Sequence, residues 1–175
     1  MKHLVLVSLC AAGLATVAHA EVKRAAADGF LVEHQLTIAA PPKRVFEAVV
    51  KPGAWWSDAH TWSGHASNLT IDPKAQGCFC ETWSDGSVEH GHVTHVERDK
   101  LLRLDATLGP LQEMALSAVL TFALTAKEDT TVLVVTYRGS GDSGHKLDAI
   151  ATPVDAVLGE QLGRLKHYIE TGHPE

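Results

Sequence analysis

The stretch PVDAVLGEQLGRLKHYIET, residues 153–171, carries the clearest helical pattern in the sequence. Its apolar side chains recur every three or four residues and therefore fall on one face of a helix. Thr152 and Pro153 suit the first turn of such a helix, and Gly172 suits its end. The apolar face consists of Val154, Val157, Leu158, Leu162, Leu165, Tyr168 and Ile169. The sequence thus predicts a C-terminal helix over residues 153–171 that packs against another layer of the domain.

The chain before this helix is rich in strand patterns. Residues 29–38 alternate between apolar and polar side chains, which is typical of a half-buried strand. Two prolines follow, and residues 43–50 then have the apolar spacing of a short helix. The later strands are predicted at residues 67–72, 78–83, 88–97, 101–108, 116–126 and 131–139. Because the turns between them are short, neighbouring strands should be antiparallel.

This order of elements resembles the START and birch-pollen-allergen superfamily, also called SRPBCC. Within it, several segments resemble the polyketide-cyclase and heat-shock-protein ATPase-activator branches. The similar segments are AAPPKRVF at 39–46, WW at 55–56, GCF at 77–79, GHV at 91–93 and LLRL at 101–104. The resemblance implies an α+β helix-grip fold: a curved antiparallel sheet of about seven strands wraps around the long C-terminal helix, with two short helices after the first strand. It also implies a cavity for hydrophobic ligands between sheet and helix.

The first twenty residues are typical of a cleavable signal peptide. Lys2 precedes an apolar stretch over residues 4–17, and the small-residue sequence AHA at 18–20 suits signal peptidase. The stretch is too short for a permanent membrane anchor. Cys10 raises the alternative of lipid attachment, but bulky Leu9 precedes it where a small residue is expected. We therefore expect a mature domain of residues 21–175, exported to the periplasm or secreted, with no stable membrane anchor.

Charge and cysteine content narrow the function classes further. The net charge is −6, or −7 without the signal peptide, and no basic stretch exceeds two residues, so nucleic-acid binding is not expected. No repeat or linker divides residues 21–175, which predicts one domain of unknown oligomeric state. Only Cys78 and Cys80 remain in it. Two residues apart on a strand, they lie near the upper limit of disulfide geometry and are expected to stay unbridged unless a bulge brings them closer.

The strands at 78–83 and 88–97 are predicted to form a hairpin that turns at Asp85 and Gly86. In that register Glu81 lies opposite His90. A carboxylate beside an imidazole in an apolar pocket can transfer protons, so these two residues are the candidate catalytic pair. The alternative is a polar pair on the solvent side of the sheet, and a one-residue slip would exchange the two faces.

Other side chains are candidates for ligand contact because the strand at 29–38, the hairpin, the helix junctions or the terminal helix would carry them toward the cavity. The candidates are His34, Trp55, Trp56, Phe79, Trp83, His92, Leu158 and Leu162. In the predicted register Phe79 lies opposite His92. Core packing is the alternative for the tryptophans, and at least one of them is expected in the core. No metal site is predicted, since the cysteines and His90 should point to opposite faces and zinc needs convergent ligands. No cofactor is expected.

Three functions remain open at this point. The first is a binding or carrier module that holds an apolar or aromatic small molecule beside Leu158 and Leu162. The second is a cyclase-like or isomerase-like enzyme that uses Glu81 and His90. The third is a protein-interaction module with a filled core and no cavity. Activation of a chaperone ATPase would require a cytosolic partner, and the predicted export argues against it.

Overall fold

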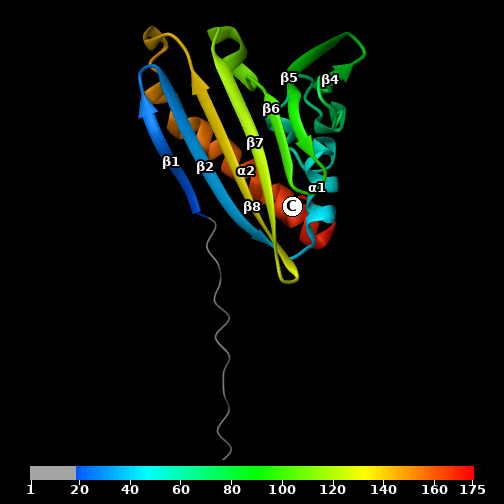
Figure 1. Cartoon of the computed structure of the whole chain (residues 1–175). Helices are drawn as coiled ribbons and strands as arrows, with labels where there is room; N and C mark the ends of the chain where they lie inside the picture. The colour runs from blue at the N-terminus through cyan, green and yellow to red at the C-terminus, as the bar shows by residue number, and fades with distance from the viewer. Residues whose placement is uncertain (1–18) are drawn as a thin grey trace, which may run out of the picture.

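The structure, a computed structural model, describes residues 19–175, and an eight-stranded antiparallel sheet packs there against a long C-terminal helix (Figure 1). The strand order is β1-β2-β8-β7-β6-β5-β4-β3, with β1 and β3 at the two edges. The expected α+β helix-grip fold is confirmed, with eight strands where about seven were predicted. The predicted signal peptide falls mainly on residues 1–18, outside the described residues.

The strands match most of the predicted segments. They are β1 (His19–Ala26), β2 (Gly29–Ile38), β3 (Leu69–Ile71), β4 (Cys78–Trp83), β5 (Gly86–Glu97), β6 (Leu101–Asp105), β7 (Ser117–Lys127) and β8 (Thr130–Ser140). β1 was not predicted, and it pairs with β2 from His19 to Ala26 with one register shift between Val22 and Arg24. The strand predicted over residues 101–108 ends at Asp105, because Gly109 and Pro110 begin a 3-10 helix, η4 (Gly109–Met114), that leaves the sheet.

The helices differ more from the predictions. α1 (Pro42–Val49) is the short helix expected after β2, and the second short helix is replaced by three 3-10 turns, η1 (Pro52–Ala54), η2 (Asp58–His60) and η3 (Ala66–Asn68). A further turn, η5 (Ser143–His145), precedes α2 (Leu147–Thr171). α2 therefore begins six residues before the predicted start at Pro153, which lies inside the helix. Burial of Leu147 and Ala151 anchors the additional turns and offsets the hydrogen bond that the proline lacks.

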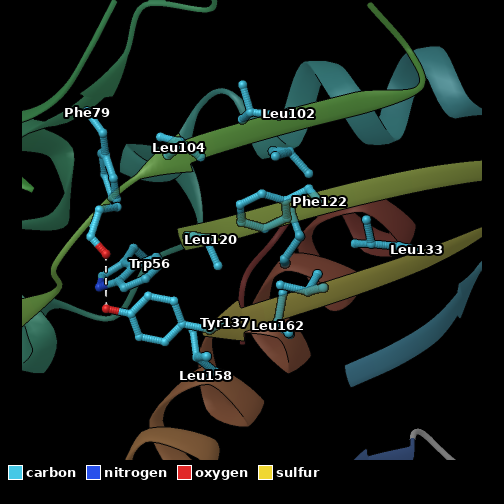
Figure 2. Packing of buried hydrophobic residues seen from close by; sticks show 14 of the residues in the cluster. Trp56, Phe79, Leu102, Leu104, Leu120, Phe122, Leu133, Tyr137, Leu158 and Leu162 are labelled. Carbon is cyan, nitrogen blue, oxygen red and sulfur yellow. Dashed lines mark hydrogen bonds between the residues drawn. The ribbon is translucent and has the colours of Figure 1, made fainter. Parts of the chain in front are cut away.

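The core lies between the inner face of the sheet and α2. From α2 it includes Leu158, Leu162 and Leu165. Leu158 and Leu162 pack toward buried side chains of β7 and β8 (Figure 2). Each large aliphatic side chain buried there contributes about 1.5–3 kcal/mol of transfer free energy. The apolar face predicted for the helix is thus covered by the sheet.

The turn of the β4–β5 hairpin falls one position earlier than predicted. Trp83 pairs with Gly86, so Ser84 and Asp85 form the turn. A Cβ on Gly86 would lie 2.6 Å from the Trp83 ring, so the glycine lets the indole pack across the hairpin. The pairing consequently moves by two residues on β5, and Glu81 lies opposite Val88 where His90 was predicted. A shift of two preserves the faces, because side chains alternate with a period of two.

A bulge then interrupts the same hairpin. Cys80 pairs with Glu89, whereas Phe79 pairs with Gly91, so His90 is the additional residue on β5. Both His90 and Gly91 are buried. A Cβ on Gly91 would lie 2.3 Å from the carbonyl oxygen of Asp105, which leaves room for glycine alone. The predicted Phe79–His92 pair is wrong because the earlier turn moves the pairing by two residues and the bulge restores only one of them, so His92 pairs with Cys78.

The prediction that Cys78 and Cys80 stay unbridged is also wrong. They form a disulfide with a Cα–Cα distance of 5.4 Å, which lies within the range that a disulfide spans. The bulge lies opposite this part of β4 and is the irregularity that such a bridge requires. A pattern of alternating residues contains no signal for it.

Of the helices within residues 19–175, none combines the length and apolar character needed to cross a bilayer.

Candidate functional site

A cavity of about 540 Å³ lies between the first half of α2 and the β4–β5 end of the sheet. Two loops complete its wall, one over residues 56–62 and the other over residues 108–114. Its volume falls within the range of small-molecule sites, and its lining is mainly apolar.

The helical wall is formed by one face of α2. Ile150, Val154, Val157 and Leu158 recur at the spacing of a single helical face and line the cavity. Farther along α2, Leu162 and Leu165 pack fully into the core. The open space therefore lies at one end of the sheet–helix interface, and the other end is closed by packing.

Aromatic side chains form the opposite wall. Trp56 and Phe79 meet edge to face with ring centroids 6.2 Å apart, and Phe79 lies 5.0 Å from the ring of His90. The Tyr137 hydroxyl accepts a hydrogen bond from the Leu108 N–H (3.1 Å) and donates one to the Ala106 carbonyl (3.0 Å). Burial raises the pKa of Tyr137. Its hydroxyl is thus neutral and fully used in holding the 106–108 segment, while the ring lines the cavity (Figure 2).

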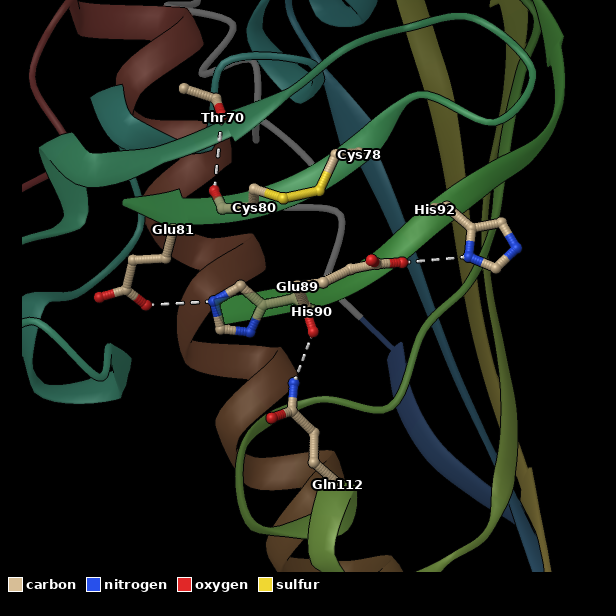
Figure 3. The surroundings of a disulfide bond; sticks show 8 residues. All are labelled: Thr70, Cys78, Cys80, Glu81, Glu89, His90, His92 and Gln112. Carbon is tan, nitrogen blue, oxygen red and sulfur yellow. Dashed lines mark hydrogen bonds and ion pairs between the residues drawn. A yellow bond between two sulfur atoms is a disulfide. The ribbon is translucent and has the colours of Figure 1, made fainter. Parts of the chain in front are cut away.

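Glu81 is completely buried and accepts three hydrogen bonds. The Trp62 N–H donates to Oε2 (3.1 Å), the Ser63 N–H donates to Oε1, and His90 Nε2 lies 3.1 Å from Oε2 (Figure 3). Burial opposes ionisation, but these hydrogen bonds outweigh it, and the pKa of Glu81 is lowered. Glu81 is therefore a carboxylate at neutral pH.

The ionised Glu81 determines the state of His90. A carboxylate only accepts hydrogen bonds, so His90 Nε2 must carry the proton and donate it. Burial lowers the pKa of His90, and its contacts with Glu81 offset this only in part. The imidazole is thus neutral at pH 7, and Nδ1 is an acceptor that has no hydrogen-bond partner among the described residues. Because His90 lines the cavity and Glu81 does not, His90 is the group of this pair that a ligand can contact.

The segment of residues 57–63, here called the cover loop, is held at both ends. The Ser57 N–H donates to Gln161 Oε1 (2.8 Å), and His60 Nε2 lies 3.2 Å from a carboxylate oxygen of Glu160, so α2 holds the first half. Glu81 holds the second half through the amides of Trp62 and Ser63. Trp62 lines the cavity and is 47% exposed, which places it at the opening.

Four of the predicted site residues line the cavity, namely Trp56, Phe79, His90 and Leu158. Glu81 lies behind His90 and contacts it, and of the two faces that the sequence left open the pair occupies the inner one. The error in the turn did not change which side chains share a face, because the pairing between β4 and β5 moved by two residues.

The other predicted contacts lie elsewhere. His34 is buried with Nε2 2.9 Å from Asp155 Oδ1, although the two atoms are not aligned for a hydrogen bond. Trp55 is a core residue whose indole N–H donates to the Ala48 carbonyl, which confirms the expectation of one core tryptophan.

The last three do not line the cavity either. Trp83 packs against Gly86, and Leu162 is a core residue. His92 faces away from the cavity and lies 3.3 Å from Glu89, because the bulge reverses the faces of β5 beyond His90 (Figure 3).

Sequence reasoning missed Tyr137, Met114 and Ile150, which line the cavity. Ile150 was missed because the helix was predicted to start after it. Met114 lies in a loop, where no periodicity assigns a direction. Tyr137 lies in a strand that was predicted at residues 131–139. The alternation of apolar side chains along that strand is the signal that could have assigned Tyr137 to the inner face.

Within residues 19–175 there is no group of three or more His, Cys, Asp or Glu side chains arranged to hold a metal ion.

One protein-family model matches most of the described domain. The model of a family described as "Activator of Hsp90 ATPase homolog 1-like protein" matches residues 39–170. No curated protein matches the sequence.

Several solved structures share the fold at low sequence identity. A conserved protein of unknown function from Enterococcus faecalis has a TM-score of 0.58 and 15% identity over 89% of this chain and 78% of that one. A putative protein of the dynemicin biosynthetic locus has a TM-score of 0.58 and 24% identity over 82% of this chain, but only 48% of that one. The Aha1 dimer from Colwellia psychrerythraea has a TM-score of 0.50 and 18% identity over 81% of this chain and 97% of that one. At these identities the likeness shows the fold alone.

Proposed function

The chain belongs to the family of activator of Hsp90 ATPase homolog 1-like proteins, and from this fold and its cavity we propose that it binds an apolar or aromatic small molecule. The ligand lies between the first half of α2 and the aromatic wall formed by Trp56, Phe79 and Tyr137. The role in the family's name is that of other proteins, and we do not transfer it to this chain.

The cavity itself is the observation that carries this proposal. Native interiors are close-packed, so a volume of about 540 Å³ beside a well-packed core is unusual for a purely structural domain. Desolvating an apolar ligand against these walls contributes about 25 cal/mol for each Å² of apolar surface removed from water. A third hypothesis, an interaction module with a filled core, does not fit this volume.

One polar contact gives the ligand an orientation. His90 Nδ1 is an acceptor without a hydrogen-bond partner among the described residues, in a mainly apolar wall, and it favours a ligand with one hydroxyl or N–H donor on an apolar body. A ligand without the donor leaves this nitrogen desolvated and unpaired, which lowers its affinity.

Export is also proposed. The signal-peptide pattern of residues 1–20 supports it, and so does the Cys78–Cys80 disulfide, because disulfides persist mainly in oxidising compartments. The mature protein then acts in the periplasm or outside the cell.

A titration with Nile red, an apolar dye that fluoresces in apolar surroundings, tests the binding proposal. Val157 is partly exposed and lines the cavity, so Val157→Trp fills it. Ala156 is exposed on the adjacent helical position, which makes Ala156→Trp a matched control. We expect Val157→Trp to weaken dye binding at least about tenfold, or about 1.4 kcal/mol, and Ala156→Trp to leave it unchanged. Equal affinity of all three proteins would contradict the proposal, provided that circular dichroism shows the fold intact.

A second candidate is an enzyme that uses His90 for proton transfer. It is favoured by the Glu81–His90 pair, in which a buried carboxylate contacts Nε2 of an imidazole that lines the cavity, so that Nδ1 is the ring nitrogen left to accept a proton. In this arrangement Glu81 positions His90 and does not itself touch the ligand. The two functions are separated by His90→Gln: retention of a ligand copurified with the wild-type protein, together with loss of solvent deuterium uptake into that ligand, indicates catalysis.

A further inference from the structure

The Cys78–Cys80 disulfide lies on the face of β4 that points away from the cavity. Phe79 and Glu81 alternate with the cysteines and are buried on the inner face, whereas both cysteines are partly exposed. Figure 3 shows the bridge along β4, beside the segment of β5 that carries Glu89, His90 and His92. The bridge therefore lies on the side of the sheet that a thiol in solution approaches.

A structural role explains this bridge poorly. A disulfide stabilises a fold mainly by restricting the unfolded chain, and the effect shrinks with the length of the closed loop. The cysteines are separated by Phe79 alone, so the loop is as short as three residues. Accessible disulfides are the ones that are more readily reduced and that serve redox functions.

The bridge coincides with the irregularity that positions His90. Cα atoms two residues apart in a regular strand are about 6.6 Å apart, whereas those of Cys78 and Cys80 are 5.4 Å apart. β4 is therefore contracted at Phe79, directly opposite the place where β5 inserts His90 as an additional residue. The contraction and the bulge occur at the same rung of the hairpin.

We propose that Cys78–Cys80 is a reversible thiol–disulfide exchange site, with low-molecular-weight thiols as co-reactants, and that its redox state is transmitted through the bulge to His90. In the disulfide form the bulge holds His90 Nε2 against Glu81. In the dithiol form β4 extends toward regular strand spacing, and the bulge and the His90–Glu81 contact loosen.

The exchange is balanced by two equivalents of thiol. A thiolate attacks one sulfur of the bridge, the Cys78–Cys80 bond breaks, and a mixed disulfide forms while the other cysteine leaves as a thiolate and takes a proton from water. A second thiolate attacks the mixed disulfide at the external sulfur, which releases the oxidised small molecule and the second cysteine thiolate. In sum, the protein disulfide gains two electrons and two protons, and two thiols become one disulfide.

Equilibration of the full chain in mixtures of reduced and oxidised glutathione tests the exchange. Alkylation followed by mass spectrometry of the peptide that contains both cysteines distinguishes this site from Cys10. We expect the fraction of dithiol to change continuously with the glutathione ratio while circular dichroism shows a folded protein. A bridge that stays closed at every ratio until the protein unfolds would overturn the proposal.

Nuclear magnetic resonance tests the transmission without any ligand. On reduction, the ring resonances of His90 and the amides of Trp62 and Ser63 are expected to shift, while the ring of His173, beyond the end of α2, serves as the control. The double variant Cys78→Ala, Cys80→Ala should show the shifted positions without reductant and no response to it. If this variant does not fold, the reduced and alkylated wild-type protein gives the same comparison. Exchange that leaves the His90 resonances unchanged would overturn the coupling.

Discussion

Replacing Glu81 by glutamine tests whether this carboxylate holds the cover loop and His90 together. The side chain is completely buried and its two oxygens accept hydrogen bonds from the amides of Trp62 and Ser63 and from His90. Glutamine has nearly the same shape but offers one acceptor oxygen and an NH₂ group. Whichever way it is oriented, its NH₂ group meets at least one N–H donor.

The expected cost follows from these contacts. A hydrogen bond to a charged group contributes about 1.5–3 kcal/mol, and leaving a buried donor unsatisfied has a further desolvation cost. Loss of one such bond and weakening of the others predicts that Glu81→Gln lowers the free energy of unfolding by about 2–4 kcal/mol. That is a large share of the stability of an ordinary domain but leaves the protein folded.

Urea unfolding of the wild-type protein and Glu81→Gln measures this difference, and amide hydrogen exchange locates it. Protection of the Trp62 and Ser63 amides should fall more than protection of the central strands. Glu89→Gln is the matched control, since Glu89 is exposed on the adjacent strand and should change stability by no more than about 0.5 kcal/mol. Equal stability of Glu81→Gln and Glu89→Gln would refute the view that Glu81 anchors the loop.

Three further predictions concern protonation, the aromatic wall and processing. Burial lowers the pKa of His90 below its ordinary 6.5, so as the pH falls the histidine is protonated in the unfolded chain at a higher pH than in the folded protein. The free energy of unfolding should therefore fall as the pH drops through 6.5, and more steeply for the wild-type protein than for His90→Gln. Parallel pH profiles of the two proteins in urea unfolding would contradict this. Tyr137→Phe leaves the Leu108 N–H and the Ala106 carbonyl without their partner. It should destabilise the protein by about 1–3 kcal/mol and weaken Nile red binding. An unchanged urea-unfolding midpoint would show that the hydroxyl is dispensable. The exported protein should begin at Glu21 by intact mass, and a product that retains residues 1–20 or carries lipid on Cys10 would disprove the cleavage site.

The periodic parts of the fold were predictable from the sequence. The apolar face around Leu158 and Leu162 predicted a buried helix, and the alternation in residues 29–38 and 78–83 predicted β2 and β4 with their observed bounds. These predictions succeeded because burial of one face imposes a period that the residues display.

The failures have local physical causes. The turn at Ser84 and Asp85 depends on the Trp83 ring packing over Gly86, a contact between side chain and backbone that no hydrophobic pattern reports. The bulge at His90 depends on close packing of Gly91 against β6.

The cavity wall was predicted only in part for a related reason. Phe79, His90 and Leu158 belong to periodic elements, in which the pattern shows which residues share a face, although for the β4–β5 hairpin it left open which face points inward. Trp62 and Met114 belong to loops whose course is determined by individual hydrogen bonds, such as those that Glu81 accepts from the Trp62 N–H and Tyr137 accepts from the Leu108 N–H. A sequence pattern identifies the faces of the regular elements, and the loops that close the cavity remain outside its reach.

Intermolecular nuclear Overhauser effects between bound Nile red and the protein methyl groups test the binding site most directly. Ile150, Leu158 and Met114 line the cavity from α2 and η4, whereas Leu162 is packed into the core beyond it. A ligand in the proposed site should therefore give contacts to the first three residues and none to Leu162. Contacts confined to methyl groups outside the cavity, with none to Ile150, Leu158 or Met114, would contradict the claim that this cavity is the binding site.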